Sequence, residues 1–266
     1  MSKKYNIFGV SIDDISTNEI TDLFLNWLNG SQAKIIFTPN PEFLLLARKN
    51  KNFTQILNQS DLSLPDGIGL KFAITALTNY RVENRQTGID TLLILAKICS
   101  ETGKRLVLIG GVDNVASETA HILSQHFPKL DINLIDLEII SGNASQVSIP
   151  KKLIDEINSR SPDVLAVALS FGKQECFIFE ILKFIPSLKI AIGVGGAFDT
   201  ISGRLKRAPV WMRKNGFEWL WRVIIEPKRI IRILRATIVF PLFVVWDTLK
   251  NRRFWRAVIN VIKELL

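Results

Sequence analysis

The stretch RLVLIGG (105–111), followed by VASETAHILSQHF (115–127) and DINLIDLEII (131–140), decides the fold of this chain. The first segment is an apolar run that ends in two glycines, the second has the apolar spacing of a helix, and the third is again a strand-like run. Strand, helix and strand in this order predict a crossover unit with two neighbouring parallel strands. The sequence therefore predicts an α/β protein.

The same alternation continues on both sides of this unit. Upstream, AKIIFTP (33–39) predicts a strand, and PEFLLLARKN (41–50) predicts a helix with proline in its first turn. The elements predicted downstream are a helix at 148–162, a strand at 163–170, a helix at 173–185 and a strand at 188–196. We therefore expect a Rossmann-like, parallel-rich sheet with flanking helices.

The segment DTLLILAKICSETG (90–103) adds a further helix before the central unit. Asp90 is expected as its N-cap residue, because a short polar side chain can accept a hydrogen bond from the first free amides. Gly103 is expected just after its C-terminus, where the backbone often turns left-handed.

The composition changes after Gly203. Residues 204–266 hold 15 Lys and Arg against 4 Asp and Glu, a net charge of +11, whereas the preceding 203 residues carry a net charge of −2. This change predicts a catalytic α/β domain at 1–203. It also predicts a basic, apolar, helical C-terminal appendage at 204–266 that ends in the helix FWRAVINVIKELL (254–266).

The positive charge of the appendage indicates a partner with an anionic surface, and its apolar residues favour a lipid membrane over nucleic acid. Five of the six tryptophans lie in it, and Trp with Lys and Arg is typical of the headgroup region of a bilayer. The tryptophans of the appendage are Trp211, Trp219, Trp221, Trp246 and Trp255. An ordinary basic helical subdomain is the alternative. A nucleic-acid-binding protein is disfavoured because the segment is apolar and contains no recognised nucleic-acid module.

Three features bear on the compartment. Cys99 and Cys176 each lie in an apolar stretch, which predicts buried, reduced thiols in the cytosol. The N-terminal residues contain no apolar signal-peptide core. The apolar run 236–246 is interrupted by Pro241 and has about half of the ~20 residues that a membrane span needs. We expect a peripheral protein at the cytoplasmic face of the plasma membrane.

Residues that follow the predicted strands are the first candidates for a site, because α/β sheets bind ligands at the carboxyl ends of their strands. Asp66 in LPDGIGL (64–70) lies between turn-forming residues, with Gly67 and Gly69 after it. Its carboxylate could act as a general base on a hydroxyl group. From spacing alone, an ordinary Asp-Gly turn is the favoured interpretation.

Other strand ends carry further polar groups and glycines. Gln174 and Glu175 open the helix 173–185, where they could bind a sugar or uracil or could simply be first-turn residues. The segment GVGGAFD (193–199) could bring backbone amides close to a phosphate, but Phe198 stands where a dinucleotide-binding motif needs glycine. The remaining candidates at these strand ends are Thr38, Asn40, Glu42, Gly193, Gly195, Gly196 and Asp199.

The sequence contains none of the common metal or nucleotide motifs. It lacks a G-x-x-x-x-G-K-[ST] loop, a Cys/His cluster and a D-x-D motif. His121 and His126 both fall on the predicted helix 115–127, so acid–base chemistry is assigned to carboxylates. We therefore predict no metal site and no cofactor.

Taken together, these segments resemble the WecG/TagA/CpsF family, glycosyltransferase family 26. The resemblance covers most of the chain in the expected order, and its last long block is the most specific. It runs through TPNPEF (38–43), PDGIG (65–69), RQTGID (85–90), LIGG (108–111), KQE (173–175), GVGGAFDTISGRLKRAPVWMRKNGFEWLWR (193–222) and EPKRIIR (226–232).

The resemblance implies an inverting transferase that moves a sugar, best guessed as N-acetylmannosamine, from a UDP-sugar donor. The implied acceptor is a sugar on a polyprenyl diphosphate at a membrane surface, in the synthesis of a cell-surface polysaccharide or a teichoic-acid-type polymer. Asp66 matches the family's proposed base, and Thr38 and Gln174 match pocket residues. A homo-oligomer is also possible.

The resemblance assigns Arg222, Arg229 and Arg232 to the acceptor's diphosphate. Arginine suits this role because it stays charged and binds phosphate through two parallel hydrogen bonds. Their spacing would align them on one face of a continuous helix, although Pro227 interrupts the segment. Arg85 is a second candidate for phosphate contact.

The chain departs from the family pattern before KQE. Gly172 replaces the usual proline, and Ser170 and Phe171 stand where a glycine is usual, which leaves donor recognition open. The tail beyond Arg235 is also longer than the family core requires. A noncatalytic, membrane-docked scaffold with this fold is the alternative function, and retention of the matched site residues argues against it.

Overall fold

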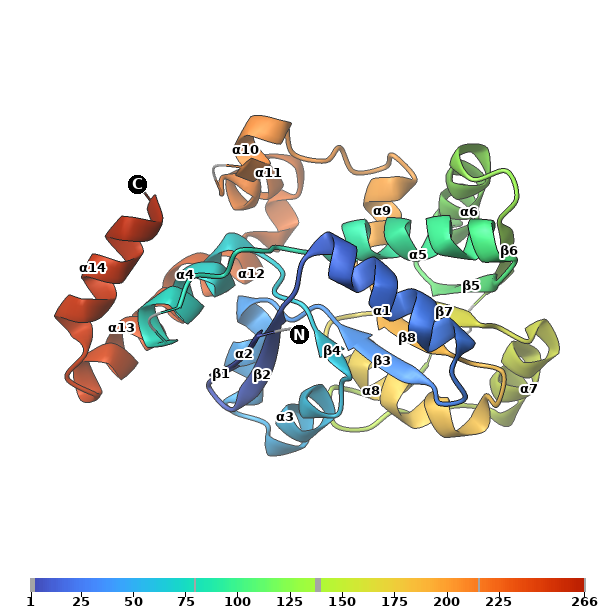
Figure 1. Ribbon diagram of the computed structural model, residues 1–266, viewed down its shortest axis with the longest axis horizontal. Helices are drawn as coiled ribbons and strands as arrows, with labels where there is room; N and C mark the ends of the chain where they lie inside the picture. The colour runs from blue at the N-terminus through green and yellow to red at the C-terminus, as the bar shows by residue number, and fades with distance from the viewer. Residues whose placement is uncertain (1–2, 79, 137–139, 215, 266) are drawn as a thin grey trace.

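A six-stranded parallel sheet forms the centre of the molecule, for which a computed structural model describes residues 3–78, 80–136, 140–214 and 216–265 (Figure 1). The order of the strands is β4-β3-β8-β7-β5-β6, and all neighbours pair in parallel. The strands are β3 (Lys34–Phe37), β4 (Leu62–Ser63), β5 (Arg105–Gly110), β6 (Asp131–Ile135), β7 (Val164–Ala168) and β8 (Ile190–Gly193). The predicted α/β fold is confirmed.

Helices cover both faces of this sheet, which explains why its inner strands are continuous apolar runs rather than alternating ones. All residues of β7 and β8 are buried. One face packs against α2 (Pro41–Ala47), α3 (Lys51–Asn58), α7 (Lys151–Arg160) and α8 (Lys173–Ile181). The other face packs against α1 (Thr17–Asn29), α5 (Gly88–Thr102), α6 (Val115–His126) and α9 (Ala197–Ile201).

The neighbouring strands β3 and β8 lie where the helices change sides. The helix after β3 is α2, which packs on one face, whereas the helix after β8 is α9, which packs on the other. Connections that diverge in this way leave a crevice at the carboxyl ends of the two strands, which is the usual ligand position in open α/β sheets. The candidate site is therefore at this edge.

Several elements near the site were not predicted from the sequence. An antiparallel hairpin of β1 (Lys3–Ile7) and β2 (Val10–Asp14) precedes α1, and the short strand β4 pairs beside β3. The buried carboxylate of Asp13 joins the two by accepting a hydrogen bond from the amide of Ser63 at 2.9 Å. Helix α4 (Ile68–Thr78) then begins directly after the Asp66 loop.

The predicted ends of α5 need one correction. Thr87, not Asp90, is the N-cap residue: Thr87 Oγ1 accepts from the amide of Asp90 at 3.2 Å and donates to its carboxylate at 2.6 Å. Asp90 therefore lies in the first turn, where its negative charge favours the helix N-terminus. Gly103 adopts the predicted left-handed conformation, with φ of 67°.

Most of the predicted elements are shorter than expected, and β6 and α8 are two examples. Strand β6 ends at Ile135, and residues 137–139 of the predicted strand 131–140 lie outside the described residues. Helix α8 ends at Ile181, and a 3-10 turn at Leu182–Phe184 continues it, within the predicted range 173–185.

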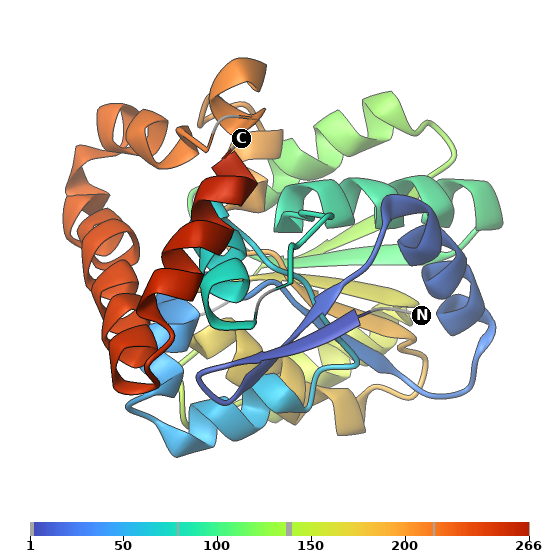
Figure 2. The ribbon, with the colours of Figure 1, turned by 60° about the vertical axis from the view of Figure 1, so that its left-hand side comes forward.

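The C-terminal segment forms a chain of short helices that curves around α4 (Figures 1 and 2). Its elements are α10 (Val210–Lys214), α11 (Glu218–Ile225), a 3-10 turn (Pro227–Arg229), α12 (Ile230–Leu234), a π-helical turn (Arg235–Val239), α13 (Phe240–Lys250) and α14 (Phe254–Leu265). Because the helix breaks at Pro227, the three candidate arginines do not share one continuous helix.

The last helices share the core of the sheet domain. Phe240 is fully buried, Val244 and Ala257 are nearly so, and all three belong to the apolar cluster beneath α2 and α4. The division at Gly203 into 1–203 and 204–266 stays a prediction. Among the described residues, no helix combines the length and apolar character that crossing a membrane requires. Cys99 and Cys176 are buried free thiols, as predicted.

Candidate active site

Asp66 is held by two loops that follow the neighbouring strands β3 and β4. Its backbone amide donates to the carbonyl of Pro39 at 2.9 Å, which ties the Asp66 loop to the loop after β3. Gly67 has φ of +90°, a conformation that favours glycine. A Cβ atom at Gly69 would lie 3.2 Å from Cγ of Pro41, so the close approach of the loops also favours glycine there.

A cavity of about 540 Å³ opens beside Asp66, between the sheet domain and the C-terminal helices. Its polar wall combines carboxylates, arginines and the cap of α2, namely Asn40, Glu42, Asp66, Arg85, Glu218, Arg222, Arg229 and Arg232. Its apolar wall includes Ile68, Phe72, Phe217, Trp219, Ile233, Ala236 and Pro241. The structure thus brings the candidate arginines and the candidate base into one space, although they are more than 150 residues apart in the chain.

Asn40 and Glu42 have local partners in this wall. The side-chain oxygen of Asn40 caps α2 by accepting from the amides of Glu42 and Phe43 at 2.9 and 3.4 Å. The carboxylate of Glu42 accepts from Arg232, with Nη2 at 2.8 Å and Nε at 3.1 Å from Oε2. This two-point ion pair ties α12 to α2.

Two other cavity arginines also lie against carboxylates. Arg229 pairs with Glu226 at 2.8 Å, and Arg85 pairs with Glu218 at 2.5 Å. Among the ion pairs of the described residues, those of the cavity arginines involve Arg85, Arg229 and Arg232 and not Arg222. The cavity therefore holds several guanidinium groups whose protein partners are anions, and a phosphate group could replace those partners.

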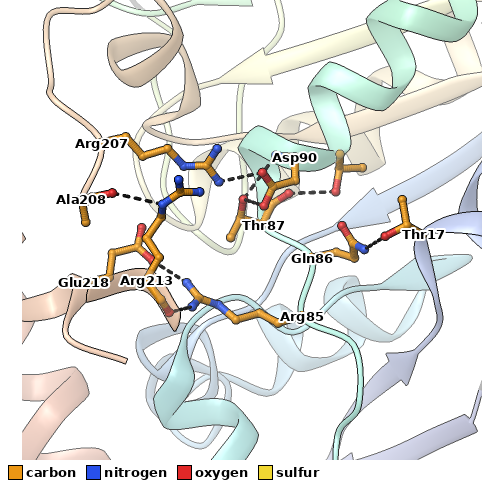
Figure 3. Close-up of polar contacts among 10 residues, drawn as sticks. Thr17, Arg85, Gln86, Thr87, Asp90, Arg207, Ala208, Arg213 and Glu218 are labelled. Atoms are coloured by element: carbon orange, nitrogen blue, oxygen red, sulfur yellow. Dashed lines mark hydrogen bonds and ion pairs between the residues drawn. The ribbon is translucent and has the colours of Figure 1, made fainter. Parts of the chain in front are cut away.

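Figure 3 shows how the segment before α5 is joined to the segment after α9. Arg207 donates to the carboxylate of Asp90 at 2.6 Å, and Arg213 donates to the carbonyl of Ala208 at 3.0 Å. Arg85 reaches across from the other side toward Glu218. These contacts fix the start of the C-terminal segment against the RQTGID segment, so α11 is placed over the Asp66 loop.

The ionisation of Asp66 depends on its burial and on the charged side chains around its carboxyl group. Burial raises the pKa of its carboxyl above the ordinary value, because water that would stabilise the charge is excluded. The positive charges of Arg85 and Arg222 act in the opposite direction, and the negative charge of Glu218 raises the pKa further. A carboxylate with an increased proton affinity beside a cavity has the character of a general base.

A second group of candidates lies at the carboxyl end of β8. Thr38 is buried, and its hydroxyl donates to the carbonyl of Gly193 at 3.3 Å. Gln174 is also buried, and its side-chain oxygen accepts from the amide of Gly195 at 3.0 Å. Neither side chain lines the cavity, so the structure places both behind the strand-end loop rather than in its open space.

Glu175 lies deeper still. Its side chain has no exposed surface, and its Oε1 accepts from the side-chain amide of Gln174 at 2.5 Å. Burial raises the pKa of Glu175 to about 7, although the hydrogen bond from Gln174 opposes the shift. The predicted contact between Glu175 and a substrate is thus not available in this arrangement.

The titration of Glu175 predicts a pH dependence of stability. The pKa in the folded protein is raised from 4.5 to about 7, so the folded state is stabilised below about pH 4.5 and loses this contribution as the pH rises to 7. Glu175→Gln is neutral at every pH. We expect it to gain up to about 3 kcal/mol relative to wild type between pH 4.5 and 7 in urea unfolding. A pH-independent difference would contradict the raised pKa.

The glycine loop after β8 lies between the buried group at the end of β8 and the arginines of the cavity wall. A Cβ atom at Gly196 would lie 3.9 Å from Nη1 of Arg229 and 3.7 Å from Oδ2 of Asp199. Asp199 itself stands in the first turn of α9. The loop after β8 therefore approaches Arg229, which lines the cavity, although no residue of the loop lines the cavity itself.

Sequence reasoning missed the carboxylates of the C-terminal segment. Glu218 and Glu226 pair with Arg85 and Arg229 at the cavity edge, and neither was a candidate. The sequence did offer one signal for them: acidic residues are rare in this segment, since residues 204–266 contain only four against 15 basic ones. Phe72 and Trp219 were also missed, because apolar cavity walls have no motif. Among the described residues, no group of three or more His, Cys, Asp or Glu could hold a metal ion.

The chain is similar over most of its length to known glycosyltransferases. The model of the glycosyl transferase WecG/TagA/CpsF family matches residues 5–254. A relative from Bacillus subtilis (strain 168), an N-acetylglucosaminyldiphosphoundecaprenol N-acetyl-beta-D-mannosaminyltransferase, is 31% identical over 218 residues, which cover 82% of each chain. Enzymes of the same name from Bacillus spizizenii and Staphylococcus aureus (strain MRSA252) are 30% and 27% identical, over 84% and 86% of this chain and 83% and 88% of theirs.

The protein is therefore a glycosyltransferase. Its parallel α/β sheet carries a carboxylate and an arginine-rich cavity at the carboxyl ends of the strands. The chain is a member of the WecG/TagA/CpsF family of glycosyltransferases.

Proposed function

We propose that this glycosyltransferase moves N-acetylmannosamine, or a closely related hexose or N-acetylhexosamine, from a UDP-sugar to a sugar carried on a polyprenyl diphosphate. The observation that carries the proposal is the single cavity that contains Asp66 together with Arg222, Arg229 and Arg232. The names of the relatives support the same acceptor class, because they describe transfer to N-acetylglucosaminyldiphosphoundecaprenol.

In the proposed reaction, Asp66 takes the proton of the acceptor's sugar hydroxyl. The hydroxyl oxygen attacks the anomeric carbon of the donor, the bond to UDP breaks, and the configuration at that carbon inverts. Because negative charge develops on the departing diphosphate, cationic side chains near the Gly193–Gly196 loop stabilise the transition state. Arg229, whose Nη1 lies next to the Gly196 position, is the nearest guanidinium to that loop.

The acceptor's diphosphate would occupy the arginine wall. Arg232 and Arg229 exchange carboxylate partners for phosphate oxygens, while Arg222 gains a partner, so binding replaces ion pairs rather than creating isolated charges. The apolar wall around Phe72 and Pro241 would face the lipid end of the same molecule.

A transfer assay tests this proposal. Full-length protein, radiolabelled UDP-N-acetylmannosamine and a short-chain polyprenyl-diphosphate N-acetylglucosamine should give a labelled lipid disaccharide. A panel of other UDP-sugars should react more slowly. If no UDP-sugar supports transfer although the protein is folded, the noncatalytic scaffold becomes the better account.

Membrane binding is the second part of the proposal. Trp246 and Trp255 are 66% and 76% exposed on α13 and α14, and the nearby sequence carries the exposed residues Arg252, Arg253 and Arg256. Exposed tryptophan beside arginine is typical of proteins that bind the headgroup region. We propose that these helices dock the enzyme peripherally, on the cytoplasmic face of the membrane.

Trp246→Ser with Trp255→Ser is expected to lower binding to vesicles that contain anionic lipid by about tenfold or more, because both rings leave the interface. Flotation of the full-length double variant measures this. Trp27→Phe in α1, on the opposite side of the sheet domain, is the matched tryptophan control and should bind like wild type. Equal flotation of all three proteins would refute the assignment.

We propose further that transfer needs no divalent metal, because the cavity supplies guanidinium groups for the diphosphates and the sequence has no D-x-D motif. Treatment with EDTA should leave the rate within about twofold of the untreated enzyme. Loss of activity in EDTA that magnesium or manganese restores would show that the prediction is wrong.

A further inference from the structure

We infer that Glu175 is a positioning residue that fixes the side chain of Gln174 and, through it, the backbone of the glycine loop at Gly195. The inference rests on the proposed function for its meaning in donor binding. Its geometric part concerns only how three neighbouring groups hold one another, and that part can be tested on the protein alone.

The three groups form one chain of hydrogen bonds. The Gly195 amide can only donate, so it requires the oxygen of the Gln174 side chain, which lies at 3.0 Å. The side-chain NH₂ of Gln174 then has to point the other way, and it donates to Oε1 of Glu175 at 2.5 Å. An acceptor at position 175 is therefore what orients the amide of Gln174 correctly.

Burial leaves no substitute for this acceptor. Glu175 has no exposed surface and Gln174 is 3% exposed, so water cannot replace the bond between these two side chains. The backbone of β8 closes the remaining side, because a Cβ atom at Gly193 would lie 2.9 Å from Nε2 of Gln174 and 3.2 Å from Oε1 of Glu175. Glycine at 193 lets the two side chains approach the strand end.

Gly195 needs such support because of its backbone. It has φ of +50°, and no atom lies within 4 Å of the position that a Cβ would take, so side-chain packing does not hold it. The hydrogen bond to Gln174 is thus a main restraint on the loop that runs from β8 toward Arg229. The Gly195 amide is also occupied inside the protein, so its role toward a phosphate would be to set the course of the loop.

Amide hydrogen exchange of full-length, nitrogen-15-labelled protein tests the geometric part. The Val194 amide, which donates to the carbonyl of Val167 at 2.9 Å, is the internal reference. Glu175→Leu and Gln174→Met should each raise the exchange rate of Gly195 relative to Val194 by about five- to tenfold. Glu175→Gln keeps a carbonyl oxygen at the same place and should resemble wild type.

A matched control separates positioning from general destabilisation. Ile178 lies on the same helix α8, is fully buried and is not part of the hydrogen-bonded chain. Ile178→Ala should lower the melting temperature and leave the ratio of Gly195 to Val194 exchange unchanged. Where Glu175→Leu folds poorly, Glu175→Met removes the acceptor with less change of shape.

The double variant provides the sharper result. If Glu175 acts through Gln174, then Gln174→Met with Glu175→Leu should change Gly195 exchange no more than either single change. Additive effects would overturn the inference, and so would an unchanged exchange ratio in Glu175→Leu or an equal change in Ile178→Ala.

The effect of Glu175 on the reaction can be measured as a change in donor binding. Titration with UDP should give a dissociation constant about ten- to hundredfold higher for Glu175→Leu than for wild type, with the KM for the lipid acceptor unchanged. Wild type that does not bind UDP would contradict the proposed donor and leave the exchange result standing. Normal UDP affinity in Glu175→Leu would overturn the positioning role.

Discussion

Asp66→Asn is expected to lower the rate of sugar transfer by about 10²–10⁴-fold while the fold remains intact. Asparagine has the same shape and can keep the loop geometry, which depends on the backbone bond from residue 66 to Pro39. It cannot accept a proton from the acceptor hydroxyl. The loss should therefore appear in kcat, with the KM for both substrates little changed.

The pH dependence of the wild-type rate gives an independent check on Asp66. Burial raises the pKa of this carboxyl above its ordinary value of 3.8, so the base becomes protonated and the rate falls at a higher pH than for an exposed aspartate. Asp66→Asn should lack this acidic limb. A near-normal kcat for Asp66→Asn, with circular dichroism unchanged, would remove Asp66 from the role of base.

Arg222→Ala should lower kcat/KM for the lipid-linked acceptor by about 10–10²-fold, because a hydrogen-bonded ion pair with phosphate contributes about 1.5–3 kcal/mol. Arg222 lines the cavity and lies near enough to Asp66 to lower the pKa of its carboxyl. The same substitution should therefore move the acidic limb of the rate to higher pH, which loss of acceptor contact alone would not do.

Two control variants make this result specific. Arg222→Lys keeps the positive charge but not the two parallel donors, so its kcat/KM should lie between those of wild type and Arg222→Ala. Arg256 is an exposed arginine of α14 outside the cavity, and Arg256→Ala should be nearly normal with a short-chain acceptor in detergent. Equal losses in Arg222→Ala and Arg256→Ala would mean that general charge, not the cavity, explains the effect.

Much of the fold follows from local pattern. The runs RLVLIGG (105–111) and DVLAVALS (163–170) became β5 and β7, because strands covered on both faces must be apolar along their whole length. The two-residue strand β4 could not be predicted, since its place depends on pairing with β3 rather than on its own composition. Asp90 was wrongly assigned as a cap because Thr87, three residues earlier, provides the same hydrogen bond.

The candidate site was likewise predictable from the sequence only in part. Residue types and their spacing were enough to predict the chemical groups of the site, namely a carboxylate followed by two glycines and a C-terminal set of arginines. Which of these groups meet depends on tertiary packing. The Arg85–Glu218 and Glu42–Arg232 ion pairs, together with the packing of α13 and α14 on α4, hold the three arginines beside Asp66. The course of β8 instead buries Gln174 and Glu175 behind the loop. Contacts between distant segments depend on how apolar faces pack, and spacing along the chain does not encode that packing.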